Sequence, residues 1–207
     1  AFSAPLVTHQ YDFGYAPPRD NNGNTMVYGV PTADLVDEFE MADGSKFSWS
    51  NATHAANPYA NREKRFYASI LYHGAEWKGR TLNTSVDDAQ EGFSQYAALA
   101  EPRRTVTGYY TRKFLDPTNT TFGVNRSSQS WVELRLAEVY LNLAEAKAGL
   151  DDYSGSASTL SALRVARGLN IVNYNTAASS LAAIEHERMV ELAFEGHRFW
   201  DLRRWRK

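Results

Sequence analysis

The chain has 207 residues, of which 43% are hydrophobic and 22% charged, and its net charge is −2. This length suits one large domain or two small ones, and the near-neutral charge offers no electrostatic footprint for nucleic acid. Cysteine is absent, which excludes disulfides and thiolate metal sites, and no apolar run approaches the ~18 residues of a membrane span.

The first thirty residues have no helical periodicity. Three aromatic residues alternate there: Tyr11, Phe13 and Tyr15. This alternation indicates a short edge strand. Three polar residues have the spacing of the first ligands of a calcium loop: Asp20, Asn22 and Asn24. The glycine and the closing glutamate of such a loop are missing, so an asparagine-rich turn is the preferred interpretation.

The next elements are short. A helix is expected over residues 31–43, with Thr32 as its N-cap, and Asp43-Gly44 ends it with turn chemistry. Two aromatic blocks, Phe66–Tyr72 and Tyr109–Phe114, are interpreted as strands.

The second half of the chain is helical. The segment from Trp131 to Lys147 repeats apolar residues at spacings of three and four, and a second apolar stripe follows Leu136, Val139, Tyr140 and Leu143. Two stripes predict a helix buried on more than one side. A second helix is expected at about Ser156 to Arg167, with Ser154 or Ser156 as its cap. Further helices are expected near Ser179 and after Gly196, so the fold is predicted to be mainly α, with a tetratricopeptide-like helix pair.

The last 28 residues mix aromatic residues with charges of both signs. Six of them are expected to form an ion-pair junction between helices: Glu187, Arg188, Glu191, Glu195, Arg198 and Asp201. An alternative is a glycosidase that uses Glu191 and Glu195. Such an enzyme needs one carboxyl group that stays protonated, whereas neighbouring arginines lower a carboxyl pKa. A structural network is therefore preferred, and no catalytic residue is assigned.

Two C-terminal blocks, residues 137–146 and 187–205, resemble the SusD/RagB family of nutrient-binding outer-membrane lipoproteins of Bacteroidetes. Residues 31–44, 57–72 and 107–114 resemble further blocks of that family in the same order. The sequence departs from the family at Arg62-Glu63-Lys64-Arg65, where an Arg-Asp-Pro-Arg turn is usual. The family's N-terminal helical half, lipid-bearing cysteine and C-terminal tail have no counterpart here, so an internal piece of a larger protein is expected.

The resemblance implies one SusD-like domain over residues 1–207. Residues 1–125 would form a loop-rich ligand side with a few short strands, and residues 126–207 a helical body. The implied function is capture of an oligosaccharide or polysaccharide at the outer-membrane surface and its delivery to a SusC-like TonB-dependent transporter. It implies binding without catalysis, and membrane attachment only through a lipid anchor outside this chain. The histidines have no ligand spacing, so no metal site is assigned, and neither a cofactor nor a nucleic-acid partner is expected.

Sugar rings stack their apolar faces on aromatic side chains, and their hydroxyl groups need polar neighbours. Five aromatic residues in polar loops are candidates for glycan stacking: Trp49, Tyr15, Tyr11, Tyr59 and Trp77. For Trp77, which lies in a block shared with the family, packing of the loop onto the body is the preferred interpretation. Besides the glycosidase, a tetratricopeptide-like protein-interaction scaffold without glycan affinity remains an alternative.

Overall fold

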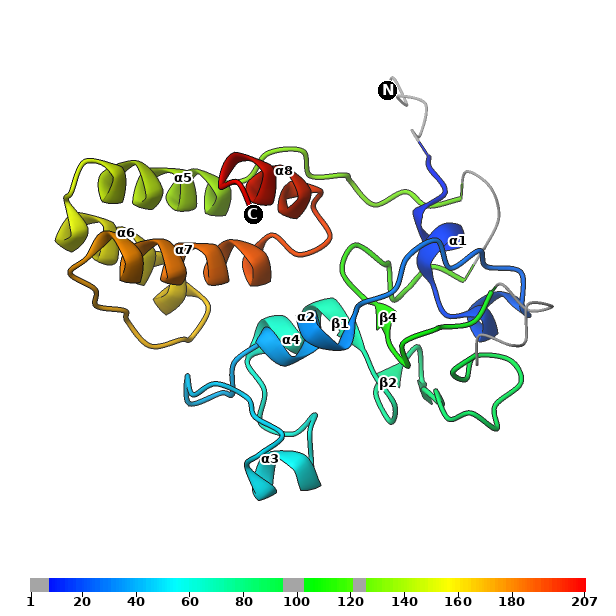
Figure 1. The fold of residues 1–207 in the computed structure, drawn as a ribbon. Helices are drawn as coiled ribbons and strands as arrows, with labels where there is room; N and C mark the ends of the chain where they lie inside the picture. Colours follow the sequence, from blue (N-terminus) through cyan, green and yellow to red (C-terminus); the bar gives the residue numbers. More distant parts are fainter. Residues whose placement is uncertain (1–7, 95–102, 121–125) are drawn as a thin grey trace. The chain divides into compact units, whose positions relative to one another are not determined.

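The computed structural model describes residues 8–94, 103–120 and 126–207. The chain divides into two compact units, each built from two separate stretches (Figure 1). The first unit comprises Ala1–Ala33 and Ala68–Trp131, and the second comprises Asp34–Tyr67 and Val132–Lys207. The stretch Asp34–Tyr67 therefore belongs with the C-terminal helices, although it lies within the predicted loop-rich region.

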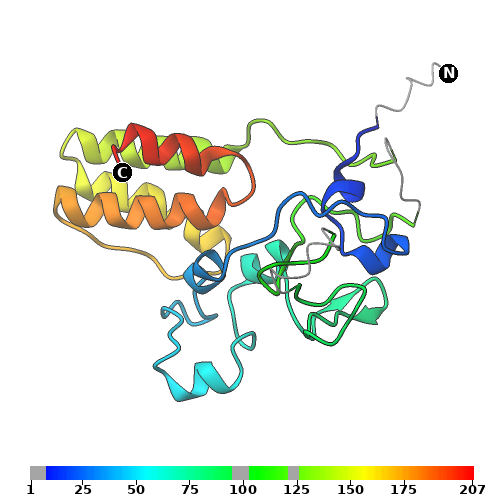
Figure 2. The same ribbon diagram turned by 45° about the vertical axis from the view of Figure 1, so that its right-hand side comes forward.

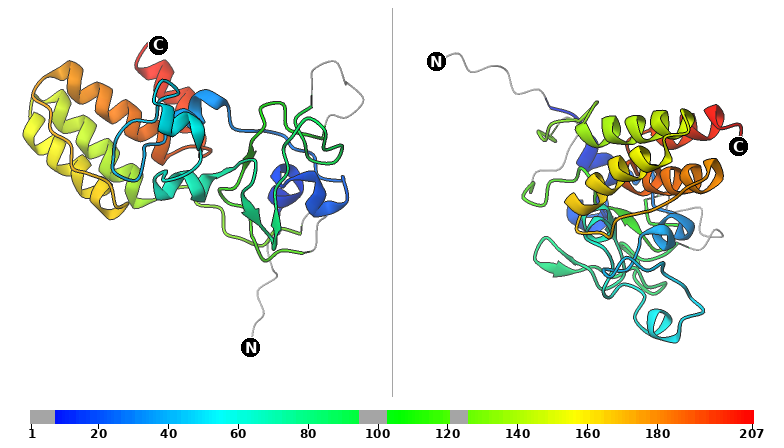
Figure 3. Two further views of the ribbon diagram at one scale, coloured as in Figure 1. Left: turned by 90° about the horizontal axis from the view of Figure 1, so that it is seen from below. Right: turned by 90° about the vertical axis from the view of Figure 1, so that its left-hand side faces the viewer.

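The second unit contains the long helices, which confirms the predicted mainly α class. Helices α5 (Leu136–Gly149), α6 (Tyr153–Ala166) and α7 (Ala177–Glu191) pack side by side, and the short α8 (His197–Arg204) follows them (Figures 2 and 3). Their shared core consists of Ala137, Leu141, Ala144, Leu160, Leu163, Ile184 and Leu192. Burying these apolar side chains is what holds the helices together, because short isolated helices are marginal in water.

Local signals set where the helices begin. The N-cap of α6 is Asp152, whose carboxylate accepts the backbone N–H of Gly155 at 2.8 Å. The predicted caps Ser154 and Ser156 are wrong, because both lie inside α6. Ser156 instead donates its hydroxyl to the carbonyl oxygen of Ala144 at 2.6 Å, which ties α6 to α5.

A capping box starts α7, and a glycine starts α8. Thr176 accepts the N–H of Ser179 through its side chain, while the Ser179 hydroxyl accepts the N–H of Thr176. Gly196 precedes α8 with a φ of 81°, a left-handed conformation that costs glycine least. The turn between α7 and α8 is thus encoded locally.

The second stripe of α5 is not buried, contrary to the prediction. Leu136 is 68% exposed and Leu143 is 47% exposed, and only Tyr140 of this stripe packs against the helical core. The buried stripe of α5 faces α6 and α7, and no element in the described part of the second unit covers the opposite side. One apolar face of α5 is therefore open.

The stretch Asp34–Tyr67 contributes α2 (Ala33–Glu38), α3 (Ala52–Ala56) and the start of α4 (Lys64–Ser69). Helix α2 ends at Glu38, earlier than predicted, and Gly44 forms a turn with a φ of 81°. The predicted strand Phe66–Tyr72 is wrong over most of its length: α4 continues to Ser69, and only β1 (Ile70–Leu71) is extended. Phe66 of α4 and Ile70 of β1 are both buried.

The first unit has little regular structure. Its described residues form α1 (Tyr11–Tyr15), the 3-10 turn η1 (Pro18–Asn21) and two antiparallel strand pairs, each only two residues long. β1 pairs with β4 (Tyr110–Thr111), and β2 (Glu76–Trp77) pairs with β3 (Arg80–Thr81). The predicted edge strand at Tyr11–Tyr15 is wrong, because this segment is helical. Of the predicted strand Tyr109–Phe114, only β4 forms a strand.

A separate apolar core holds the first unit. It consists of Ala16, Leu71, Trp77, Leu82, Tyr110 and Leu115. Tyr11 and Tyr15 of α1 pack against this core while remaining partly exposed. The core therefore positions one edge of the aromatic site described below.

Candidate functional site

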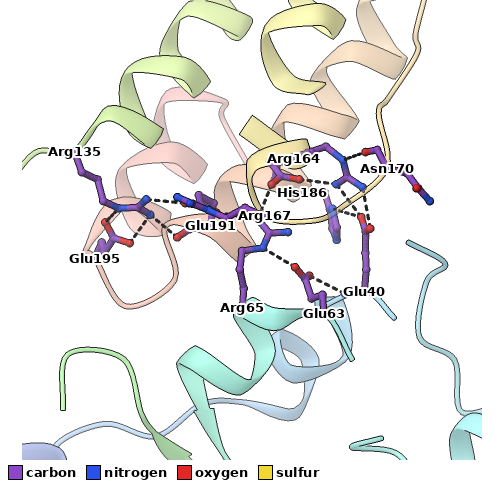
Figure 4. Close-up of polar contacts among 11 residues, drawn as sticks. Glu40, Glu63, Arg65, Arg135, Arg164, Arg167, Asn170, His186, Glu191 and Glu195 are labelled. Carbon is purple, nitrogen blue, oxygen red and sulfur yellow. Dashed lines mark hydrogen bonds and ion pairs between the residues drawn. The ribbon is translucent and has the colours of Figure 1, made fainter. Parts of the chain in front are cut away.

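The predicted ion-pair junction forms a buried network in the second unit (Figure 4). Arg65 lies near its centre. Its guanidinium donates to Glu63 at 2.6 Å, to Glu187 at 2.5 Å and to Glu191 at 3.0 Å. Burial alone would lower the pKa of Arg65, but the charges of Glu187 and Glu63 raise it above its usual range. Arg65 is therefore firmly cationic and ties the start of α4 to α7.

Arg164 of α6 makes the second link to Asp34–Tyr67. Its guanidinium holds both carboxylate oxygens of Glu40, at 3.0 and 2.9 Å, and also donates to Glu187 at 2.7 Å. Its Nε donates to the carbonyl oxygen of Asn170 at 2.9 Å. This bidentate, fully satisfied arrangement is the kind in which a buried arginine is stable.

Two more arginines hold the carboxylates at the end of α7. Arg135 donates to Glu191 at 2.6 Å and to both carboxylate oxygens of Glu195, each at 2.7 Å. Arg167 donates to Glu191 at 2.7 Å. The two carboxylates proposed as a catalytic pair therefore share the guanidinium of Arg135.

Burial alone would raise the pKa of Glu191, but hydrogen bonds from Arg167 and Arg135 and the charge of Arg65 lower it to about 2. A general acid must stay protonated near neutral pH, which requires a raised pKa. Glu191 is therefore suited to pairing charges and unsuited to donating a proton to a leaving group.

A second cluster links α7, α8 and α5. Arg188 donates to Asp201 at 2.9 Å and to the side-chain oxygen of Asn142 at 2.7 Å. Arg204 donates to Asp201 at 2.8 Å and pairs with Glu145. Arg198, which the sequence placed in the junction, is exposed and forms no ion pair with a described residue.

The aromatic side chains of the first unit form a different kind of site. Tyr11 and Tyr15 stack with ring centroids 4.5 Å apart. Tyr28 meets Tyr15 edge-on at 6.1 Å, and Trp131 lies 6.0 Å from Tyr11. These four rings, the aromatic row, line a pocket of about 360 Å³ together with His9 and Gln10. Tyr28 and Trp131 are 57% and 50% exposed, so both ends of the row are open to solvent.

Local backbone features position the aromatic row. Tyr28 donates its N–H to the carbonyl oxygen of Gly14 at 2.8 Å, and its ring lies directly over Gly14. A Cβ at position 14 would come within 2.8 Å of that ring, so glycine makes room for it. The Tyr11 hydroxyl donates to the carbonyl oxygen of Lys113 at 3.3 Å, which fixes the ring that carries the stack.

Sequence reasoning selected Tyr11 and Tyr15 but missed Tyr28 and Trp131. Nothing in the local pattern joins Trp131 to α1, because they lie more than a hundred positions apart in the chain. A glycine between aromatic residues, as at Gly14, was the available signal for a ring packed on α1.

The other three candidate aromatics have different surroundings. Trp77 is only 3% exposed, and its indole N–H donates to Asp20 at 2.6 Å, so it offers no open face for stacking. Tyr59 stacks on Phe66 and is partly exposed. Trp49 is 53% exposed and donates its indole N–H to Asp37 at 2.8 Å. Tyr59 and Trp49 belong to the second unit and do not contribute to the pocket.

Asp20, the first residue with the calcium-like spacing, holds two side chains of the protein. Both carboxylate oxygens of Asp20 accept hydrogen bonds, one from Trp77 and the other from Arg80 at 2.6 Å. Within residues 8–94, 103–120 and 126–207, no three His, Asp or Glu side chains are grouped as a metal site requires. Asp20 therefore supports the loop carrying β2 and β3.

Comparison with known proteins identifies the family. The model of the SusD family matches residues 7–207, and the chain belongs to this family. A SusD-like protein from Bacteroides fragilis is 31% identical with a TM-score of 0.74, over 97% of this chain and 39% of its own. A SusD-like carbohydrate-binding protein from the same species is 25% identical with a TM-score of 0.74, over 96% and 39%.

A SusD superfamily protein from Bacteroides vulgatus shares the fold at 21% identity, with a TM-score of 0.63 over 93% of this chain and 36% of its own. The chain thus spans about two fifths of the length of these solved relatives or less. A search of curated proteins found no match. None of the helices in the described residues is both long and apolar enough to cross a membrane.

Proposed function

We propose that the protein binds an oligosaccharide or polysaccharide at the bacterial cell surface without cleaving it. The observation that carries this proposal is the aromatic row, four rings along a pocket in the first unit. Aromatic faces beside a few polar groups suit the apolar faces and hydroxyl groups of sugars. Membership of the SusD family and the similarity to a SusD-like carbohydrate-binding protein support it.

Two rings of the aromatic row are anchored on the core, and the other two are available to contact a ligand. Tyr11 and Tyr15 are held against the core of the first unit, so their rings are fixed before a ligand arrives. Tyr28 and Trp131 are half exposed at the two ends, where a sugar ring can reach their faces. Rigid aromatic side chains lose little conformational entropy on binding, which favours affinity from a small contact area.

The carboxylate chemistry supports binding without cleavage. Glu191 and Glu195 are both held by Arg135, and the lowered pKa of Glu191 removes the proton that a glycosidase acid must supply. Incubation with any glycan that binds is expected to release no reducing sugar. Release that disappears in Glu191→Gln would contradict this part of the proposal.

Trp49 remains a second candidate contact. It is the exposed member of a pair with Phe47, whose ring it meets at 5.1 Å, and it lies in the second unit. Its hydrogen-bond partner Asp37 is a polar group of the kind that sugar hydroxyl groups need nearby. Trp49 and the aromatic row can be tested in parallel.

Affinity electrophoresis against a panel of polysaccharides tests the proposal. The wild-type protein is expected to be retarded by at least one glycan, and Trp131→Ala is expected to lose most of the retardation. Trp49→Ala then measures the contribution of the second candidate, with Trp200→Ala, an exposed tryptophan of α8, as the matched control. A wild-type protein that no glycan retards would favour the protein-interaction scaffold.

We extend the proposal to delivery of the glycan to a SusC-like TonB-dependent transporter, with a lipid anchor outside this chain holding the protein at the outer membrane. Family membership supports this extension. The full-length protein is expected to copurify with such a transporter from detergent-solubilised outer membranes. Its recovery from the soluble fraction alone would count against both the anchor and the transporter.

A further inference from the structure

The aromatic row has the form of a track for a chain of sugars. Its successive ring centroids are separated by 6.1 Å from Tyr28 to Tyr15, 4.5 Å to Tyr11 and 6.0 Å to Trp131. The two middle rings stack on each other, and both end rings are half exposed. The pocket volume of about 360 Å³ lies near the lower end of the ~300–1,000 Å³ usual for ligand sites. A short stretch of a longer chain fits these dimensions.

Among the residues that the structure describes, the pocket lining carries no formal charge. It consists of four aromatic rings, the Gln10 amide and the His9 imidazole. The Nδ1 atom of His9 accepts the N–H of Tyr11 at 3.2 Å, and its Nε2 lies 2.7 Å from the carbonyl oxygen of Gln129. This assigns the neutral tautomer that donates from Nε2, because an accepting Nδ1 cannot carry a proton. Both nitrogens are thereby engaged within the protein.

A buried carboxylate lies next to the aromatic row. Asp12 of α1 is 1% exposed, and its oxygens accept the N–H of Asp116 at 3.1 Å and the amide of Asn119 at 2.9 Å, both neutral donors. Burial raises the pKa of Tyr11 above its usual range, and Tyr15 and the charge of Asp12 raise it further. The surroundings of Tyr11 therefore disfavour a negative charge.

Two nearby lysines, Lys78 and Lys113, lie outside the described lining of the pocket. The ammonium group of Lys78 donates to the carbonyl oxygen of Asn119 at 2.7 Å and lies 3.7 Å from a carboxylate oxygen of Asp20. That of Lys113 lies 5.8 Å from the centroid of the Phe114 ring, and neither lysine lines the pocket. A carboxylate or sulfate entering the pocket would lose its hydration without gaining a cationic partner from the described lining residues.

We infer that the aromatic row, lined by uncharged groups and lying beside buried Asp12, selects a neutral glycan segment at least two sugar rings long and rejects uronic and sulfated glycans. This inference rests on the proposed glycan-binding function. It names Tyr28, Trp131 and the uncharged Gln10 as the residues that determine length and charge specificity.

A chemically matched pair of ligands tests the charge preference. The neutral polysaccharide that retards the protein best is compared with its C6-oxidised form, in which primary alcohols have become carboxylates. Dissociation constants are measured for both at constant ionic strength. The oxidised form is expected to bind at least about tenfold more weakly. Equal or tighter binding of the oxidised form, or of native polyuronates in the same panel, would overturn the inference.

A variant of the protein that gains a charge in the pocket tests the same claim. Gln10 is an exposed member of the pocket lining, and Gln10→Lys places an ammonium group there. This variant is expected to recover several-fold of the affinity for the oxidised glycan. The control Gln90→Lys adds the same charge at an exposed position outside the lining and is expected to leave the preference unchanged. Equal effects of the two variants would mean that net charge, and not the pocket, sets the preference.

Competition with fragments of the bound glycan tests the length. Affinity is expected to rise several-fold from monosaccharide to disaccharide and to level off by about three or four rings, the number of rings in the row. A monosaccharide that competes as well as a trisaccharide would overturn the length assignment. Preferential binding of chitosan fragments would reveal a cage for cations and would overturn the neutral assignment. Failure of every glycan, of any charge, to bind would refute the proposed function itself.

Discussion

Gly14 is the residue on which the geometry of the aromatic row depends most directly. Gly14→Ala adds a Cβ that meets the Tyr28 ring at 2.8 Å, so the ring must move away from Tyr15. We expect glycan affinity to fall several-fold. Helix α1 is expected to persist, because alanine favours helix more than glycine by about 1 kcal/mol. Titration calorimetry combined with thermal denaturation checks this, and unchanged affinity would mean that Tyr28 does not contact the ligand.

Arg164 and Arg198 form a matched pair for testing the buried network. Arg164→Met leaves Glu40 and Glu187 buried without one of their cations, and we expect the free energy of unfolding to fall by about 3–5 kcal/mol. Arg198→Met removes an exposed charge and is expected to change it by less than about 0.5 kcal/mol. Urea unfolding of the two variants gives the comparison. Similar small losses would show that the network contributes little to stability.

At the residue scale, the sequence predicted the composition of the charged junction but not its extent. Glu187, Arg188, Glu191, Glu195 and Asp201 could be selected because they are crowded into one segment. Arg65, Glu63 and Glu40 could not, since they lie more than 110 positions before α7 and join it only after the chain has folded. Arg198 was included on crowding alone and points to solvent.

Helix α5 carries a buried apolar face and an exposed apolar face. Leu141 is fully buried between the helices, whereas Leu143 is about half exposed on the open face. Leu141→Ala is expected to cost about 2–5 kcal/mol of unfolding free energy, because it leaves a cavity in the core. Leu143→Ala should cost less than about 1 kcal/mol. Chemical denaturation of both variants checks the difference, and comparable costs would imply that the open face is covered in solution.

At the element scale, the sequence predicted an element correctly where its apolar spacing was long and regular. The long helices α5, α6 and α7 were predictable from apolar spacing, and the glycine before α8 marked its start. Short aromatic segments were not predictable, because a run such as Phe66–Tyr72 fits a strand and a helix equally well. The α1 segment folds as a helix against the expectation from alternation, and the α4 segment does so against the expectation from a short aromatic block. Tertiary context, which a local pattern does not encode, decides those cases.

At the scale of the whole molecule, the lowered pKa values predict how stability depends on pH. Glu191 has a folded-state pKa of about 2, and the pKa values of Asp201 and Glu145 are also lowered, because arginines outweigh the effect of burial. Since the folded state depresses these pKa values, their stabilisation is fully present above about pH 4.5 and is lost as the pH falls towards 2. Thermal unfolding between pH 7 and pH 2 should show the midpoint falling mainly below pH 4.5. A midpoint that stays constant down to pH 2.5 would contradict this.

The division of the molecule was only partly visible in the sequence. The long helices α5, α6 and α7 all lie in the second half of the chain. Asp34–Tyr67 belongs with them, because Arg65 pairs with Glu187 and Glu191, and Glu40 pairs with Arg164. The aromatic row likewise joins the start of the first unit to its end, through Tyr11 and Trp131. Associations of this kind depend on tertiary structure, which no local pattern encodes.

The central claim is that the aromatic row of the first unit binds the glycan. Calorimetric titration of the best glycan into Tyr28→Ala/Trp131→Ala tests it most directly, with Phe199→Ala/Trp200→Ala, two equally exposed aromatics of α8, as the control. Both variants should retain the wild-type circular dichroism spectrum, because each of the four side chains is at least 50% solvent-exposed. The account predicts a loss of affinity of more than about tenfold in the first variant and none in the control. Wild-type affinity in the first variant would contradict it.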